Sequence, residues 1–170
     1  MGFSGRETER ITGEVISSNP FYPGFDLGDF QAIMRINSEY RIDVIRDRVM
    51  DAVIYVNREL IDQLTVWQLA GYAGLAEVPA EPVKQTSSVT PDETIFDVSG
   101  LVFSYKKAVY SYAKAKLLQD YSTMNRRDKA ENDGKESNGA YDDFMADCHD
   151  AIKFLTSDGA EQGSLDIYQI

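Results

Sequence analysis

The longest regular pattern of apolar and polar positions in this chain runs from Arg41 to Gly71. Apolar residues recur there every three or four positions, with mostly charged residues between them, which is the pattern of an amphipathic helix. They are Ile42, Ile45, Val49, Val53, Val56, Leu60, Leu64 and Trp67. A single helix of about thirty residues would be about 45 Å long and would need packing along its whole length. Because the other predicted helices are shorter, we expect part of this apolar face to contact copies of the same protein.

Three more helices are predicted around this one. A short helix containing Phe30 begins at a capping Asp26 or Asp29. The second major helix covers Leu101 to Tyr121, where small residues alternate with aromatic rings and would let a neighbouring helix approach closely. The last helix, Tyr141 to Leu155, repeats apolar residues at helical spacing.

Together these patterns predict an all-α fold, a small helical bundle built on one long helix, with an extended N-terminal arm, a long loop and a C-terminal tail. The apolar positions of the three largest helices would meet in one core. We expect that core to contain Ile45, Val49, Val53, Val56, Leu60, Tyr105, Val109, Tyr112, Phe144, Cys148 and Ile152.

Segments without helical periodicity divide the chain. Residues 1–24 are rich in Gly, Ser, Asn and Pro and predict a flexible arm before a helical domain that covers 25–157. Within that domain, 79–99 is a loop of about twenty residues, a length that is usually functional or disordered. We expect either a finger that reaches a partner or an excursion with a short hairpin. The charged stretch 124–140 predicts a surface linker, and 158–170 a C-terminal tail.

Apolar residues in these irregular segments are candidate contacts with other chains. The rings around Pro23 are costly to leave in water, so we expect them to dock on their own bundle or on a neighbour. The apolar residues at the C-terminus form a short extended segment that could add to another subunit. The predicted protein-interaction residues are Phe21, Tyr22, Phe25, Ile95, Phe96, Leu165, Ile167, Tyr168 and Ile170.

Composition limits the class of protein. A chain of 170 residues with 43% hydrophobic content supports one domain with appendages. Its formal net charge of −11 argues against a surface that grips DNA phosphates, although an acidic channel wall would let DNA pass without binding it. The single cysteine excludes an intrachain disulfide and is consistent with the cytoplasm. No apolar run is long enough to cross a bilayer and no signal-peptide core is present, so we expect no membrane partner.

Motifs of catalysis and cofactor binding are absent from the sequence. There is no phosphate-binding glycine loop and no nucleophile elbow. Cys148 and His149 are adjacent, but on a helix their side chains would diverge by ~100° and make a poor nucleophile pair. A group of acidic residues could attract a divalent cation but is better explained as a solvated helix face: Asp142, Asp143, Asp147 and Asp150. We therefore expect no enzyme, no cofactor and no metal site; a helical enzyme would place His149 in a concave site.

Several segments together resemble a known family. They are FYPGFDLGDF from Phe21, RIDVIRDRVMDAVIYVNREL from Arg41, AGYAGLAEVPAE from Ala70, YKKAVYSYAKAKLLQDY from Tyr105, and the terminal QI. In this order and spacing the chain resembles, from about Phe21 to Ile170, the head completion/stabilisation proteins (gpL) of contractile-tailed temperate bacteriophages. None of these segments is a catalytic signature.

The resemblance implies a structural adaptor in the neck of a virion, assembled in the cytoplasm of the bacterial host. Such a protein would bind below the portal protein after DNA packaging, stabilise the filled head and offer a surface to the tail terminator or other neck proteins. Copies would form a homo-oligomeric, dodecameric ring through which DNA passes without sequence-specific binding. A second hypothesis is a helical DNA-packaging or regulatory protein, such as a small terminase-type subunit, which would retain DNA at physiological salt.

Overall fold

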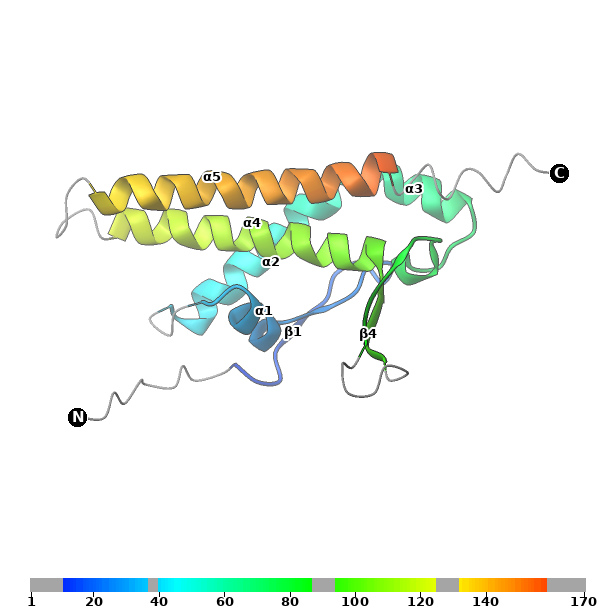
Figure 1. Ribbon diagram of the computed structural model, residues 1–170, viewed down its shortest axis with the longest axis horizontal. Coiled ribbons are helices and arrows are strands. Elements are labelled where there is room, and N and C mark those ends of the chain that lie inside the picture. Colours follow the sequence, from blue (N-terminus) through cyan, green and yellow to red (C-terminus); the bar gives the residue numbers. More distant parts are fainter. Residues whose placement is uncertain (1–10, 37–39, 87–93, 125–131, 159–170) are drawn as a thin grey trace.

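The computed structural model describes residues 11–36, 40–86, 94–124 and 132–158 (Figure 1). Helices make up most of it, with short strands near the N-terminus and in the middle of the chain. In order, the elements are β1 (Val15–Ile16), β2 (Phe25–Asp26), α1 (Leu27–Ile33), α2 (Ile42–Glu59), α3 (Ile61–Leu69), the 3-10 turn η1 (Leu75–Glu77), β3 (Pro82–Thr86), β4 (Thr94–Ser99), α4 (Gly100–Met124), α5 (Asn132–Lys153) and the π-helical turn η3 (Phe154–Asp158).

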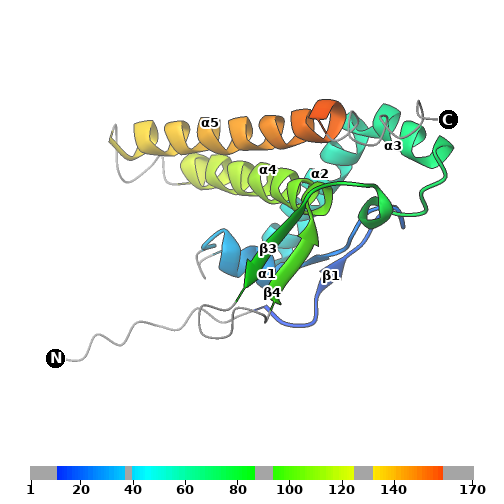
Figure 2. The same cartoon turned by 45° about the vertical axis from the view of Figure 1, so that its right-hand side comes forward.

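The central element is α4, which is buried around nearly its whole circumference. Tyr105, Tyr110 and Ser111 point in three different directions at 3.6 residues per turn, and all three are buried. A helix that is covered on all sides must be surrounded by other elements. Figures 1 and 2 show α5 running antiparallel beside α4, while α2 crosses α4 on another side. The organising helix is therefore α4, not the segment with the longest periodic pattern.

The prediction of one continuous helix from Arg41 to Gly71 is wrong. The chain leaves helical geometry at Leu60, whose φ is −98° and ψ is 8°, so that α2 ends at Glu59 and a separate α3 follows. The side chain of Leu60 is fully buried at this break. Beyond it, the ring of Trp67 stacks on Phe21 with centroids 5.9 Å apart. This contact joins segments that are far apart in the sequence. The apolar period of the sequence continues through Leu60 without interruption and therefore does not reveal the break between α2 and α3.

The predicted core is largely confirmed, and α4 and α5 are longer than expected. Of the predicted core residues, Tyr112, Phe144 and Ile152 are partly buried, and the remainder are buried: Ile45, Val49, Val53, Val56, Leu60, Tyr105, Val109 and Cys148. The last helix was expected from Tyr141 but begins at Asn132, so the linker predicted over 124–140 is shorter, and 125–131 lie outside the described residues.

The all-α prediction is also wrong, because the chain contains two small antiparallel sheets. In the first, Val15 pairs with Asp26 and Ile16 with Phe25. Strands of two residues are too short to produce a detectable alternation of apolar and polar positions, which is why the sequence predicted only an arm there. The β1–β2 pair fixes the segment that carries Phe25 immediately before α1.

The second sheet is a β3–β4 hairpin within the predicted loop 79–99, the simpler of the two alternatives for that segment. Val83 pairs with Val98 and Lys84 with Asp97. Figure 2 shows the hairpin projecting away from the helices, and the side chains of 82–85 are exposed. At its base, Gly100 donates a backbone hydrogen bond to the carbonyl of Glu81 at 3.0 Å. The hairpin therefore leads into α4 with no residue between β4 and the helix.

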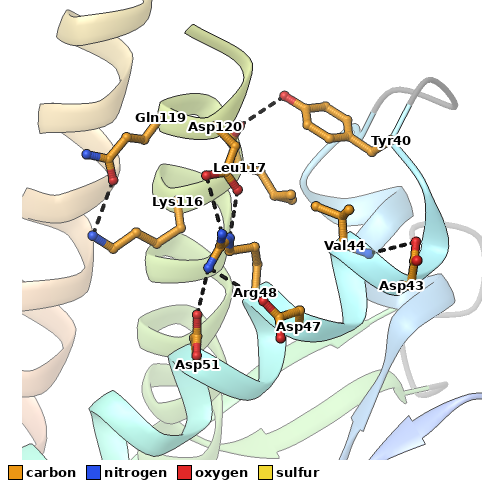
Figure 3. Close-up of polar contacts among 10 residues, drawn as sticks. All are labelled: Tyr40, Asp43, Val44, Asp47, Arg48, Asp51, Lys116, Leu117, Gln119 and Asp120. Carbon is orange, nitrogen blue, oxygen red and sulfur yellow. Dashed lines mark hydrogen bonds and ion pairs between the residues drawn. The ribbon is translucent and has the colours of Figure 1, made fainter. Parts of the chain in front are cut away.

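Charged side chains join the N-terminal half of α2 to α4 (Figure 3). Arg48 Nε donates to Asp120 Oδ2 at 2.7 Å, and Arg48 Nη1 donates to Asp51 Oδ2 at 2.8 Å. The hydrogen bond to Asp120 raises the pKa of the Arg48 guanidinium. Nearby, the Tyr40 hydroxyl donates to the carbonyl of Leu117 at 3.2 Å. Because the Arg48 and Asp120 side chains are only 29% and 32% exposed, solvent weakens this ion pair less than a surface pair.

We predict that Arg48→Met lowers the free energy of unfolding by about 1–2 kcal/mol, because it removes charge-assisted hydrogen bonds between α2 and α4. The matched control is Arg41→Met, since Arg41 pairs with Asp43 at a site where the side chains are 80% and 51% exposed. The control should change stability by less than about 0.5 kcal/mol. Urea unfolding followed by circular dichroism measures both, and equal effects would contradict the prediction.

We predict that Gly100→Ala destabilises the protein, because a Cβ at this position would lie 2.7 Å from the carbonyl oxygen of Glu81. The base of the hairpin would have to shift and lose its hydrogen bond, at a cost of about 1–3 kcal/mol. The control is Gly139→Ala in α5, where a Cβ meets nothing within 4 Å. Replacing a helical glycine by alanine there should stabilise by roughly 0.5–1 kcal/mol. Thermal unfolding of the two variants should therefore shift in opposite directions.

Candidate interaction surface

The residues considered for chemistry do not assemble into a reactive site. His149 is exposed, and its Nε2 lies 3.4 Å from the Tyr55 hydroxyl. Cys148 is buried, and burial raises the pKa of its thiol to about 12, so the thiol stays protonated and unreactive near neutral pH. The described residues contain no group of three or more His, Cys, Asp or Glu side chains that could hold a metal ion. Of the acidic set on α5, Asp147 pairs with Lys107 at 3.1 Å.

None of the helices that the structure describes is both long and apolar enough to cross a bilayer.

The aromatic residues predicted as contacts with a neighbour lie in the core of their own chain. Phe21, Tyr22 and Phe25 are 4%, 6% and 1% exposed. Tyr22 stacks on Tyr105 of α4 with ring centroids 4.4 Å apart, while Phe21 stacks on Trp67 of α3. These rings attach the N-terminal segment to two helices of the same chain and have no free face to offer a partner.

A turn before the rings explains how they reach the core. The side-chain Oδ1 of Asn19 accepts a hydrogen bond from the backbone N–H of Phe21 at 2.9 Å. The backbone carbonyl of Asn19 accepts another from the backbone N–H of Tyr22 at 3.0 Å. The carbonyl of Phe21 in turn accepts from the backbone N–H of Leu75 at 2.8 Å. The turn directs consecutive rings inward, toward α3 and α4. We therefore do not propose these rings as contact residues.

The other predicted contact residues are not described at the level of side chains. Ile95 and Phe96 belong to β4, but their side chains fall outside the described part of the structure. Leu165, Ile167, Tyr168 and Ile170 lie outside the described residues altogether.

The structure places large exposed apolar residues that the sequence prediction missed on the sides of α2 and α3 that face away from the core. We call these residues together the outer apolar face; they are Met50, Ile54, Ile61, Val66 and Leu69, which are 47%, 66%, 56%, 55% and 85% exposed. Single exposed apolar residues are common on proteins. Here, these five lie on two consecutive helices whose opposite sides are already filled by the core, and a sixth, Ile42 at the start of α2, is 40% exposed.

Charged residues border this face. Asp47, Arg58 and Asp62 are exposed on the same two helices. Apolar surface with a polar rim is typical of sites that bind other proteins. A signal for it was present in the sequence, because Met50 and Ile54 are one helical turn apart and lie outside the predicted core stripe. The position of α4 decides which side of α2 is buried, and the apolar pattern of α2 alone does not give that position.

Comparison with known proteins shows the family to which the chain belongs. A sequence model of the family described as phage head completion protein (GPL) matches residues 16–162, which is most of the chain. The chain belongs to this family. The chain is also similar to the "Probable head completion/stabilization protein" of Haemophilus phage HP1 (strain HP1c1), which is 24% identical over 163 residues, covering 96% of this chain and 97% of the relative. The search of solved structures found no match.

Membership of the GPL family confirms the resemblance found in the sequence. It makes the chain a structural, virion-associated protein of a bacteriophage, with a role in completing and stabilising the head. The match begins at Ile16, so it includes the β1–β2 segment and the buried rings as well as the helices. The N-terminal segment is thus part of the family's domain and not an appendage to it.

We predict that Leu69→Lys leaves the free energy of unfolding within about 0.5 kcal/mol of the parent, because a side chain that is 85% exposed contributes little to packing. The control on the same helix is Leu64→Lys. Leu64 is 6% exposed, so this change buries an unpaired ammonium and should cost at least about 3 kcal/mol or abolish folding. Chemical denaturation measures both variants. A large loss for Leu69→Lys would mean that the outer face is part of the core.

Proposed function

We propose that this protein is a head–tail adaptor that binds below the portal protein after DNA packaging, stabilises the filled head and provides the surface to which the tail attaches. The observation that carries this proposal is the outer apolar face of α2 and α3 on a member of the GPL family. A head completion protein must contact other virion proteins, and this face has the chemistry of a protein-binding surface. The proposed partners are the portal protein, the tail terminator or other neck proteins, and further copies of this chain.

A ring is the assembly that fits this role. Copies that contact one another through two different surfaces form a closed ring if the rotation between them closes. In a dodecameric ring below the portal, the outer apolar face of each copy would contact a different surface of the next copy. The ring would leave a central channel for DNA. The β3–β4 hairpin is a second candidate contact, because a projecting two-stranded hairpin has little stability by itself and gains from packing against a partner.

Charge supports passage of DNA over retention of DNA. The chain carries 17 basic and 28 acidic residues, for a formal net charge of −11. Sequence-independent binding needs clustered Lys and Arg that displace counterions from phosphates. Several copies around a channel would multiply the acidic charge and keep the wall from binding the duplex. The alternative of a DNA-packaging or regulatory protein has no comparable observation in its favour.

The test uses phage that cannot make this protein and are complemented with plasmid-encoded variants. We predict that the double variant Ile54→Lys, Leu69→Lys reduces nuclease-protected head DNA and tailed particles by about tenfold or more, since the loss of ~1.4 kcal/mol weakens an interface tenfold. Chemical denaturation of the double variant itself, compared with the parent, establishes that it folds. The matched control is Asp143→Lys, a surface change on α5, where Asp143 is exposed; it should complement fully.

Two outcomes would refute this proposal. Full complementation by the double variant would show that the outer apolar face contacts no essential partner. Retention of duplex DNA by the purified protein at about 0.15 M salt, in a mobility-shift assay, would favour the DNA-packaging alternative.

A further inference from the structure

The α3 part of the outer apolar face includes Leu69, the most exposed large apolar residue among those that the structure describes. Ile61, Val66 and Leu69 lie on a helix of nine residues, and Leu69 is 85% exposed. The other side of α3 is filled by Leu64 and Trp67, which are buried. An apolar surface this open on one short helix needs an occupant, and the course of the chain indicates which.

The described chain ends close to this surface. Figures 1 and 2 both show the C-terminal end of α5 beside α3. The π-helical turn η3 follows α5 and ends at Asp158, and Leu155 within it is fully buried. The position at which the chain leaves the core is therefore fixed next to α3.

The remaining sequence has the composition of a tether followed by an apolar anchor. Residues 159–164 read GAEQGS, and residues 165–170 read LDIYQI, with apolar side chains at Leu165, Ile167, Tyr168 and Ile170. Fully extended, a six-residue tether spans up to about 20 Å, whereas a helix of nine residues is about 14 Å long. The anchor can therefore reach any part of the α3 face from where the chain leaves η3.

We propose that residues 165–170 dock on the Ile61, Val66 and Leu69 face of α3 in the same chain. A tether of only six residues would hold the anchor at an effective concentration in the millimolar range, well above the concentration of a second copy in dilute solution. The tail then covers the α3 part of the outer apolar face in the free protein and leaves the Met50 and Ile54 part open. The inference rests on the proposed function for the role of this surface and adds that a head component binding at α3 must first displace the tail.

Disulfide trapping tests the docking on the free, full-length protein. The variant Leu69→Cys, Ile167→Cys is oxidised at low micromolar concentration, and the expected product is an intrachain disulfide in a species with monomer mass. The matched control is Ile33→Cys, Ile167→Cys, because Ile33 is also an exposed apolar residue, 64% exposed, but lies on α1. Cys148 does not compete, since its buried thiol has a pKa near 12. Crosslinking through Leu69→Cys should exceed the control at least fivefold.

A second measurement avoids engineered cysteines. Removing residues 165–170 should speed amide hydrogen exchange in α3 several-fold and leave exchange in α1 unchanged. Equal crosslinking of the two cysteine pairs, disulfides formed only between chains, or unchanged exchange in α3 would each overturn the inference. If these tests fail while Ile54→Lys, Leu69→Lys still blocks head stabilisation, the docking of the tail is wrong and the adaptor function stands.

Discussion

The fold depends on one constraint, the coverage of α4 around most of its circumference. Apolar and small residues occupy most sides of this helix, and the elements that cover them are α5 on one side, α2 on another and the aromatic N-terminal segment on a third. Ala108, Ala113 and Ala115 keep parts of its surface narrow enough for close approach, while its tyrosines fill the wider gaps. The Tyr105 hydroxyl donates to Asn57 Oδ1 at 2.6 Å, which satisfies its donor in a partly buried position.

The same constraint explains why the outer apolar face exists. Once one side of α2 and one side of α3 are used to cover α4 and Phe21, a large apolar residue on their other sides is not covered by the rest of the described domain. A protein that functions alone gains nothing from such residues, whereas a protein that completes a larger particle can use them as contacts. The two helices therefore have an inner side that packs in the core of the chain and an outer side that is open for the proposed contacts with other virion proteins.

Sequence periodicity located most of the core, because buried positions on α2, α4 and α5 recur at helical spacing. It failed where long-range contacts decide the structure. The break at Leu60 lies inside an unbroken apolar period. The helix after the break packs through the ring of Trp67 on Phe21, which is far away in the sequence. The first turns of α5 are polar and contain Gly134 and Gly139, so local composition predicted a linker where the helix in fact extends. The outer apolar face was missed because the sequence does not show which side of α2 and α3 packs in the core, and only that knowledge identifies the apolar residues on the opposite side as exposed.

The direct continuation of β4 into α4 has a mechanical consequence. With no loop to absorb motion, and with the base of the hairpin joined to Glu81 by a backbone hydrogen bond, a load applied to the hairpin passes straight into the helix at the centre of the domain. A partner that binds the hairpin would therefore act directly on the buried helix, without an intervening loop that could bend.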